Sequence, residues 1–207
     1  MTSHIYTQAE FLKSAPRVEH LPPDRGYEVA FAGRSNAGKS SALNCLTANK
    51  RLARTSKTPG RTQLINLFTV KDHDHRLVDL PGYGYAKVAR QVKLDWQEHL
   101  ADYLQVRESL RGLVLLMDCR HPLKESDQFL MEWAVRRQLP LHLLLTKADK
   151  LSKSQIQQAL QLVRQHCMKL SVDTDVYDLP TAQPFSSLKK QGIEELVAVL
   201  NHWFEWS

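Results

Sequence analysis

Cysteine is scarce in this chain, and long apolar runs are missing. The three cysteines, Cys45, Cys119 and Cys167, are odd in number and widely spaced. They indicate neither a disulfide framework nor a zinc site, so a reducing cytosol is the natural compartment. The N-terminus has no apolar signal core, and no segment approaches the roughly 20 apolar residues that a membrane span needs. We therefore expect a cytoplasmic protein that makes no membrane contact.

Internal repeats and low-complexity tracts are also absent, and the composition is that of one ordinary domain. The 207 residues are enough for a substantial core, and 28 Lys plus Arg against 22 Asp plus Glu give a net charge of +6. Strand and helix patterns alternate, which predicts an α/β fold with a mostly parallel sheet and helices on both faces. Residues 1–26 are predicted to be an extension ahead of a domain at 27–207, and we expect a monomer.

The octet Gly33-Arg34-Ser35-Asn36-Ala37-Gly38-Lys39-Ser40 has the spacing of a phosphate-binding loop. It follows a predicted buried strand at 27–32 and precedes a predicted helix at 41–46. Glycines let the backbone turn tightly and bring its N–H groups against phosphate oxygens. Lys39 would neutralise the β and γ oxygens of a nucleotide, and the Ser40 hydroxyl would complete a Mg²⁺ shell. The octet alone predicts a nucleotide-binding protein without specifying the base.

A second motif, Thr146-Lys147-Ala148-Asp149, follows an apolar strand at 141–145 and predicts guanine as the base. The Asp149 carboxylate would accept hydrogen bonds from guanine N1–H and the exocyclic amine, whereas adenine would leave it unpaired. Lys147 would lie over the base with its methylene stem. Near the C-terminus, Ser187 follows a further strand, and its N–H is placed to bond guanine O6.

Two segments between these motifs are candidates for sensing the third phosphate. In Asp79-Leu80-Pro81-Gly82, the aspartate would hold Mg²⁺ through a water and the Gly82 N–H would reach the γ-phosphate. Upstream, Thr62 is the best candidate for a second hydroxyl on Mg²⁺, and Thr58 is the alternative. The loop at 50–62 should become ordered when Thr62 reaches the metal.

The candidate residues form three sets. Those for catalysis are Lys39, Thr62 and Gly82, and those for Mg²⁺ are Ser40, Thr62 and Asp79. Those for nucleotide binding are Gly33, Arg34, Ser35, Asn36, Ala37, Gly38, Lys39, Ser40, Ser41, Gly60, Arg61, Thr62, Asp79, Leu80, Pro81, Gly82, Thr146, Lys147, Ala148, Asp149, Phe185, Ser186 and Ser187.

These elements, in this order, resemble the GTPases of the Ras-like P-loop class over nearly the whole chain after residue 26. Four stretches resemble the bacterial EngB family, also called YihA or YsxC: 33–36, 57–62, 79–86 and 146–150. The resemblance implies the three-layer P-loop NTPase fold of a Ras-like G domain, for which we expect a six-stranded sheet with one antiparallel edge strand. It also implies a GTPase that assists assembly of the large ribosomal subunit, with loss linked to cell division and septation defects.

Basic residues gather on the two segments whose shape should depend on GTP. They are Lys50, Arg51, Arg54, Lys57 and Arg61 in the first segment, and Lys87, Arg90 and Lys93 in the second. A basic surface that is ordered by nucleotide suits a phosphate backbone, so we expect contact with RNA. The resemblance makes this RNA the rRNA of the large ribosomal subunit or its precursor. Ordinary solvated charges are the alternative.

Two positions depart from common GTPase patterns. Tyr83 stands where Ras has a water-orienting glutamine, and because a phenol cannot position water in the same way, intrinsic hydrolysis is expected to be slow. The missing stabilisation would come from a partner or from K⁺ held by Asn36, although Asn36 also suits a tight loop without any ion. Thr146 stands where many GTPases have asparagine, and its shorter side chain is expected to weaken the tie to the purine and the phosphate loop.

Apolar residues recur at helical spacing in four segments, and each stripe predicts a helix face in the core. The stripes are Val88, Val92, Trp96, Leu100 and Leu104; Phe129, Leu130, Trp133 and Ala134; Ile156, Ala159, Leu160, Val163 and Cys167; and Ile193, Leu196, Val197 and Leu200. The terminal aromatic residues Trp203, Phe204 and Trp206 are expected to pack against the sheet.

Different functional classes therefore remain open. One is a GTPase whose hydrolysis times its release from a ribosomal precursor. The second is a nucleotide-gated RNA-binding module in which hydrolysis is incidental. A small-molecule kinase of the same P-loop class is a distant third, because Asp149 and the preceding Lys147 argue against it.

Overall fold

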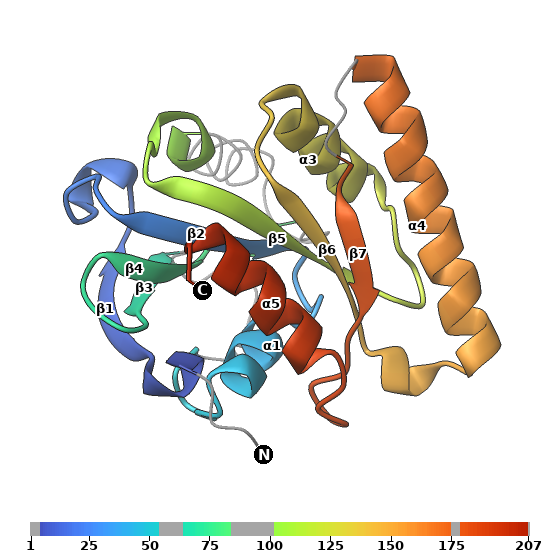
Figure 1. Cartoon of the computed structure of the whole chain (residues 1–207), viewed down its shortest axis with the longest axis horizontal. Coiled ribbons are helices and arrows are strands. Elements are labelled where there is room, and N and C mark those ends of the chain that lie inside the picture. The colour runs from blue at the N-terminus through green and yellow to red at the C-terminus, as the bar shows by residue number, and fades with distance from the viewer. Residues whose placement is uncertain (1–4, 54–63, 84–101, 175–178, 207) are drawn as a thin grey trace, which may run out of the picture.

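The computed structural model describes residues 5–53, 64–83, 102–174 and 179–206, and its centre is a seven-stranded sheet (Figure 1). The strands are β1 (Glu10–Ala15), β2 (Tyr27–Gly33), β3 (Ile65–Thr69), β4 (His75–Asp79), β5 (Leu110–Asp118), β6 (Leu141–Thr146) and β7 (Thr181–Pro184). The helices are α1 (Lys39–Leu46), α3 (Glu125–Arg136), α4 (Lys153–Thr174) and α5 (Ile193–Trp203). Short 3-10 turns lie at Ile5–Gln8, Val18–His20 and Ala148–Lys150.

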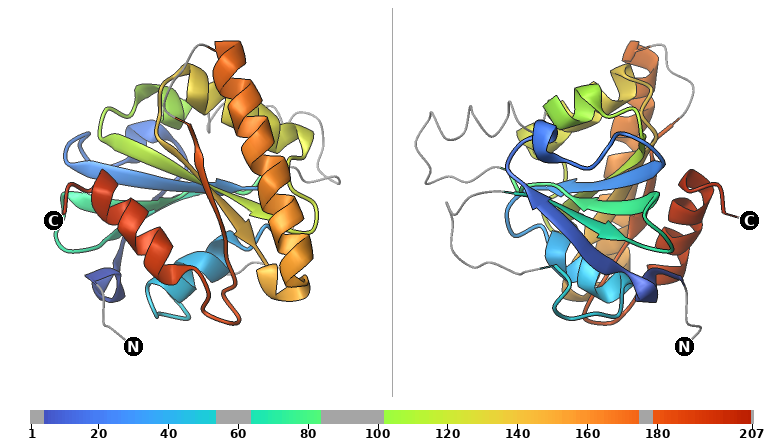
Figure 2. Two further views of the ribbon diagram at one scale, coloured as in Figure 1. Left: turned by 45° about the vertical axis from the view of Figure 1, so that its right-hand side comes forward. Right: turned by 90° about the vertical axis from the view of Figure 1, so that its left-hand side faces the viewer.

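The sheet is covered on both faces because its central strands are apolar on both sides. In β2, Val29 and Phe31 belong to one core, Ala30 and Ala32 belong to the other, and all four are fully buried. The first core lies under α1 and α5, and the second lies under α3 and α4 (Figures 1 and 2). This arrangement confirms the predicted three-layer α/β fold. Within the described ranges, no helix is long and apolar enough to cross a membrane.

The edge of the sheet differs from the expectation. The strand order is β1-β3-β4-β2-β5-β6-β7, and the last five strands run parallel to one another. Strand β3 is antiparallel to β4, as the polar turn between them suggests, but β1 pairs with its other side in a register that joins Ala15 to Ile65. The expected six-stranded sheet is therefore wrong by one strand, and the antiparallel strand β3 is internal. The added strand comes from the segment ahead of residue 26.

Aromatic residues from both terminal segments pack together under the sheet. Tyr6 is fully buried, and its phenol donates a hydrogen bond to Asn201 Oδ1 at 2.8 Å. Its ring lies against the rings of Phe204 and Trp206. Trp203 lies so close to β5 that a Cβ on Gly112 would come within 2.4 Å of the indole. The predicted packing of the terminal aromatic residues is confirmed.

Candidate nucleotide-binding site

The motifs predicted to bind a nucleotide meet at one edge of the sheet. Gly33 ends β2, Asp79 ends β4 and Thr146 ends β6, and these strands belong to the parallel part of the sheet. Ligands of open α/β sheets bind outside the carboxyl ends of the strands. The fold thus brings together segments that lie more than 100 residues apart in the chain.

The phosphate loop turns sharply from β2 into α1. Gly38 has φ of +92° and Asn36 has φ of +66°, and both values lie in the left-handed region. A Cβ on Gly33 would lie 2.8 Å from the carbonyl oxygen of Leu116, so this position has room only for glycine. Helix α1 begins at Lys39, directly after the loop. The backbone N–H groups and the positive dipole of its N-terminus favour an anion at this place.

Lys39 and Asp79 form an ion pair at the centre of the site. The Lys39 ammonium contacts Asp79 Oδ1, and only 12% and 7% of the two side chains are exposed. Ser40 is the next residue on α1. A hydroxyl and a carboxylate are oxygen ligands of the kind that Mg²⁺ takes beside phosphate oxygens and waters. Ser40 and Asp79 therefore have the chemistry of the predicted metal ligands.

The chain after Asp79 runs alongside the phosphate loop. The Tyr83 N–H donates to the Gly33 carbonyl oxygen at 3.2 Å, and the Ser35 N–H donates to the Tyr83 carbonyl oxygen at 2.7 Å. Gly82 lies against Ser35, because a Cβ at position 82 would be 3.5 Å from Ser35 Cα. Gly82 therefore lies beside the phosphate loop, which is the position that its predicted contact with a γ-phosphate requires.

The Tyr83 side chain is directed into the core. It is 2% exposed, and its phenol donates to Asp127 Oδ1 at 2.8 Å. Burial raises the pKa of this phenol well above its usual value, so the group remains a proton donor to Asp127. A phenol held in this way does not orient water, in keeping with the sequence-based inference.

Thr146 reaches the phosphate loop, contrary to the expectation from its short side chain. Its Oγ1 lies 2.5 Å from the Ala37 carbonyl oxygen and 3.1 Å from that of Met117, so one hydroxyl hydrogen is shared between two acceptors. The reach is possible because the chains pack closely: a Cβ on Gly38 would be 3.6 Å from Thr146 Cβ. The expected weak tie to the phosphate loop is wrong, and the weak tie to the purine stays a prediction.

Lys147 links the base-recognition segment to the phosphate loop a second time. Its ammonium donates to the Asn36 carbonyl oxygen at 2.7 Å and to Asp118 Oδ2 at 2.9 Å. Arg120 also binds Asp118, with Nε and Nη2 on separate carboxylate oxygens. Burial would raise the pKa of Asp118, but the hydrogen bonds from Arg120 and Lys147 hold it far below its usual range. Asp118 and Arg120 were missed in the sequence, although Asp118 ends a buried strand just as Asp79 does.

Asp149 is held by the segment that follows β7. Ser186 Oγ donates to Asp149 Oδ1 at 2.6 Å, and this bond is the main cause of the lowered pKa of Asp149. The Phe185 carbonyl oxygen accepts the Ala148 N–H at 3.1 Å. Ser187 is placed beside α1, because Cys45 Sγ lies 3.6 Å from its carbonyl oxygen. The two segments predicted to read the base therefore lie side by side.

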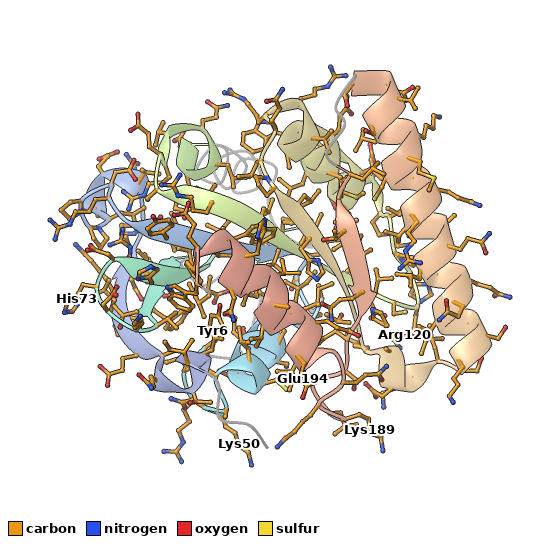
Figure 3. The ribbon with its side chains drawn as sticks, viewed as in Figure 1. Tyr6, Lys50, His73, Arg120, Lys189 and Glu194 are labelled. Atoms are coloured by element: carbon orange, nitrogen blue, oxygen red, sulfur yellow. The ribbon has the colours of Figure 1, made fainter. Side chains whose placement is uncertain are left out.

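Part of the predicted site lies outside the described residues. This is true of Gly60, Arg61 and Thr62, of the alternative Thr58, and of the basic residues at 54, 57, 87, 90 and 93. Lys50 and Arg51 are described, and both are exposed. Lys50 and Lys189 project from the lower edge of the molecule in the view of Figure 3.

A phosphate loop, an Asp79–Gly82 turn and a base-recognition loop at the ends of parallel strands define a P-loop GTPase. The sequence model of the family described as 50S ribosome-binding GTPase matches residues 28–147. The GTP-binding protein EngB of Enterobacter sp. (strain 638) is 55% identical over 204 residues, which are 99% of this chain and 95% of that relative. The chain belongs to the EngB family of GTP-binding proteins and is a GTPase.

Solved structures agree with this fold. A crystal structure of a GTP-binding protein EngB matches with a TM-score of 0.68 and 21% identity, and the match covers 86% of this chain and 98% of that one. The structure of Era in complex with MgGDPNP and nucleotides 1506–1542 of 16S ribosomal RNA matches with a TM-score of 0.63 and 21% identity. This second match covers 86% of this chain and 57% of that one.

Proposed function

We propose that this chain is a GTP-operated switch in assembly of the large ribosomal subunit, with slow hydrolysis until a partner or an ion assists it. The observation that carries the switch is the hydrogen-bonded pairing of Tyr83 with Gly33 and Ser35, which joins Gly82 to the phosphate loop. A γ-phosphate bound there would contact Gly82 and so change the segment that follows it. A need for normal cell division and septation follows from the family resemblance and belongs to the same proposal.

The phosphates would take over the partners of the central ion pair. Lys39 would leave Asp79 for β and γ oxygens, and Ser40, Asp79 and Thr62 would hold Mg²⁺. When bound, Mg²⁺ would neutralise phosphate charge. Lys39 and Gly82 would stabilise the charge that develops on the transferred phosphoryl group.

Guanine recognition would come from Asp149, with Lys147 covering the base and the Ser187 N–H bonding guanine O6. Asp149→Asn should weaken GTP and GDP binding and favour xanthosine nucleotides, because the C2 carbonyl of xanthine accepts from the new amide. Titration of both nucleotide families against both proteins tests the assignment, with Glu194→Gln on the exposed start of α5 as a matched control. Full retention of guanine preference in Asp149→Asn would refute it.

Potassium held by Asn36 is one route to faster hydrolysis. If this route operates, the rate should be higher in KCl than in NaCl at equal ionic strength, which keeps screening constant. Because Asn36 has φ of +66°, Asn36→Gly is a better variant than Asn36→Ala: it removes the amide without straining the backbone. Equal rates of the parent protein in the two salts would eliminate the ion and leave activation by a partner.

Binding to the large ribosomal subunit is supported by the description of the matched family and by a net charge of +6. The ribosomal RNA in the Era complex shows that a protein of this fold can contact rRNA. Co-sedimentation with separated ribosomal subunits, in GDP and in a non-hydrolysable GTP analogue, tests the partner. We expect the chain with the large subunit and the analogue. Equal recovery with both subunits in both nucleotides would contradict the proposal.

The alternative is a nucleotide-gated RNA-binding module. It is supported by the buried phenol of Tyr83, because this group does not orient water for hydrolysis. Multiple-turnover phosphate release, with and without large subunits, separates the two hypotheses. Acceleration by the subunits supports a GTPase switch. Nucleotide-dependent binding without acceleration supports the binding module.

A further inference from the structure

The hydrogen bond between Tyr83 and Asp127 has no part in the proposed chemistry, yet it lies next to the segment that would sense the γ-phosphate. Asp127 belongs to the first turn of α3 and is buried. Its Oδ1 accepts the Tyr83 phenol at 2.8 Å, and its Oδ2 accepts the Lys124 N–H at 3.2 Å. Both oxygens therefore act as acceptors, and the carboxylate is fixed at the start of the helix.

The charge of a residue in the phosphate loop, Arg34, also acts on this carboxylate. Burial raises the pKa of Asp127, whereas the hydrogen bonds from Tyr83 and the Lys124 N–H and the charge of Arg34 lower it. Arg34 pairs with Tyr83 through an isolated parallel bridge of the backbone. The phosphate loop, the turn after β4 and helix α3 thus converge on one buried group.

Gly82 lies between two fixed points of the chain. On one side, Asp79 ends β4 and is paired with Lys39. On the other side, Tyr83 is held by two backbone hydrogen bonds to the phosphate loop and by its phenol. Glycine has the widest choice of backbone conformations, so a Gly82 peptide without such anchors would lose more entropy on contacting a phosphate.

We propose that Tyr83 is a positioning residue: by anchoring its phenol on Asp127, it holds the Gly82 N–H in place for the γ-phosphate. The inference rests on the proposed contact between Gly82 and that phosphate. In Ras-like GTPases this position orients water. In this chain it serves instead to hold the turn at 79–82, which would sense the γ-phosphate. Loss of the anchor should therefore affect triphosphate binding and turnover while sparing diphosphate binding.

Tyr83→Phe tests this inference because it keeps the buried ring and removes only the hydroxyl. We expect the preference for a non-hydrolysable GTP analogue over GDP to fall about fivefold, the effect of one lost hydrogen bond. The value of kcat should fall by a similar factor, and the Kd for GDP should change less than about twofold by the same reasoning. Fluorescent-nucleotide titration and phosphate release measure these quantities.

Tyr103→Phe is the matched control. Tyr103 is also fully buried, and its phenol donates to Glu28 Oε2 at 2.8 Å, but Glu28 lies at the opposite end of β2. This variant should lose stability without any change in nucleotide preference. If Tyr83→Phe behaves in the same way, with lower stability and an unchanged preference, the positioning role is overturned.

Gly82→Ala separates this inference from the proposed function beneath it. Alanine keeps the N–H, and its Cβ would make only ordinary contacts, at 3.5 Å from Ser35, but alanine has fewer backbone conformations in which to direct that N–H at a phosphate. Loss of analogue preference would therefore report on the γ-phosphate contact itself. If Gly82→Ala keeps the preference, the proposed contact is wrong. If Gly82→Ala loses it while Tyr83→Phe keeps it, the contact stands and only the positioning role fails.

Asp127→Asn completes a double-mutant cycle. If the phenol acts through this carboxylate, Tyr83→Phe combined with Asp127→Asn should lower the analogue preference no further than the stronger single variant. Fully additive losses would show that Tyr83 acts through some other group, and would overturn the proposed anchor.

Discussion

The two ends of β2 hold charged side chains in opposite ways. Near its carboxyl end, Lys39 and Asp79 are paired with each other, and both are predicted to exchange this partner for a phosphate and a metal ion. At its amino end, Glu28 is fully buried and accepts hydrogen bonds from the side chains of Arg76, Arg107 and Tyr103. The first arrangement suits a binding site, whereas the second suits a scaffold.

The two sites differ in the origin of the groups that pair with their charges. Among the described residues, the side-chain donors to Glu28 lie 2.6–3.1 Å from its two carboxylate oxygens. A buried charge that is satisfied in this way resists change, because removal of either partner leaves the other unpaired in the core. The Lys39–Asp79 pair is proposed to exchange its partners for a phosphate and a metal ion, so its removal should affect binding more than folding.

Glu28→Gln should give the largest effect on stability, because it leaves buried Arg76 without its anion and leaves Arg107 with only Asp24, at 3.6 Å. We expect a loss of about 3–5 kcal/mol in the free energy of unfolding, measured by urea denaturation. Nucleotide affinity of the folded fraction should be unchanged. A loss below about 1 kcal/mol would show that Glu28 is not the essential anion of this cluster.

His142 offers a second self-contained polar site, in β6. Its ring nitrogens lie 2.8 Å from Thr181 Oγ1 and 2.9 Å from Gln183 Oε1, and burial lowers its pKa to about 4. Unfolded histidine takes up a proton near pH 6.5 while the folded form stays neutral, so stability should fall as the pH decreases from about 6.5 to about 4. Protonation of His142 should lower the free energy of unfolding by about 3 kcal/mol in total, and this loss should grow no further below pH 4.

The measurement is a series of urea denaturations across this pH range, with His142→Gln as the comparison. The variant removes this titration and should show a smaller fall in stability than the parent protein. Parallel curves for the two proteins would mean that His142 takes up a proton as readily in the folded state as in the unfolded state. Burial would then not lower its pKa.

Lys39→Ala should act mainly on binding. Loss of a charge-assisted contact to phosphate should weaken GTP binding by about 3 kcal/mol, or roughly a hundredfold in Kd. Lys50→Ala removes an exposed lysine near the end of the same helix and should leave nucleotide affinity unchanged. The comparison between the ends of β2 fails if Lys39→Ala destabilises the fold as much as Glu28→Gln while nucleotide affinity persists.

Thr146→Val should give the smallest effect. It preserves the shape of the side chain but removes the hydrogen bond to the Ala37 carbonyl oxygen, for which we expect about 1 kcal/mol, or roughly fivefold weaker nucleotide binding. Thr146→Ser keeps the hydroxyl and should remain near the parent value. Weakening in Thr146→Ser without weakening in Thr146→Val would assign the effect to the methyl group, and would leave the hydroxyl without a role.

The central strands and the phosphate loop could be predicted because their signals are local. The apolar runs at β2, β5 and β6 and the glycine spacing after β2 are visible in a few consecutive residues. Strand β1 was missed because Glu10–Ala15 is short and mostly polar or exposed, and pairs with β3 about 50 residues away. Its strand character comes from that pairing and not from its own composition.

Side-chain reach was the harder part to predict. The stripe on α3 correctly placed Leu130 and Ala134 in the core, but Phe129 is 67% exposed and its assignment was wrong. Helical periodicity shows which side of a helix faces the core, but it does not show how wide the buried face is. Phe129 lies outside that face although its neighbour Leu130 lies within it. The contact of Thr146 with the phosphate loop depends on how closely β6 approaches α1, a distance that the side-chain length alone does not reveal.

The hydrogen bond from Thr146 also sets the orientation of a peptide plane. In a trans peptide the carbonyl and the following N–H point in opposite directions, so a carbonyl of Ala37 directed at Thr146 turns the Gly38 N–H to the other side. The residue that opens the base-recognition loop thereby aims one backbone donor of the phosphate loop. Thr146 and Ala37 are 109 residues apart along the chain. A substitution of Thr146 would therefore affect a bound nucleotide by rotating the single amide between Ala37 and Gly38.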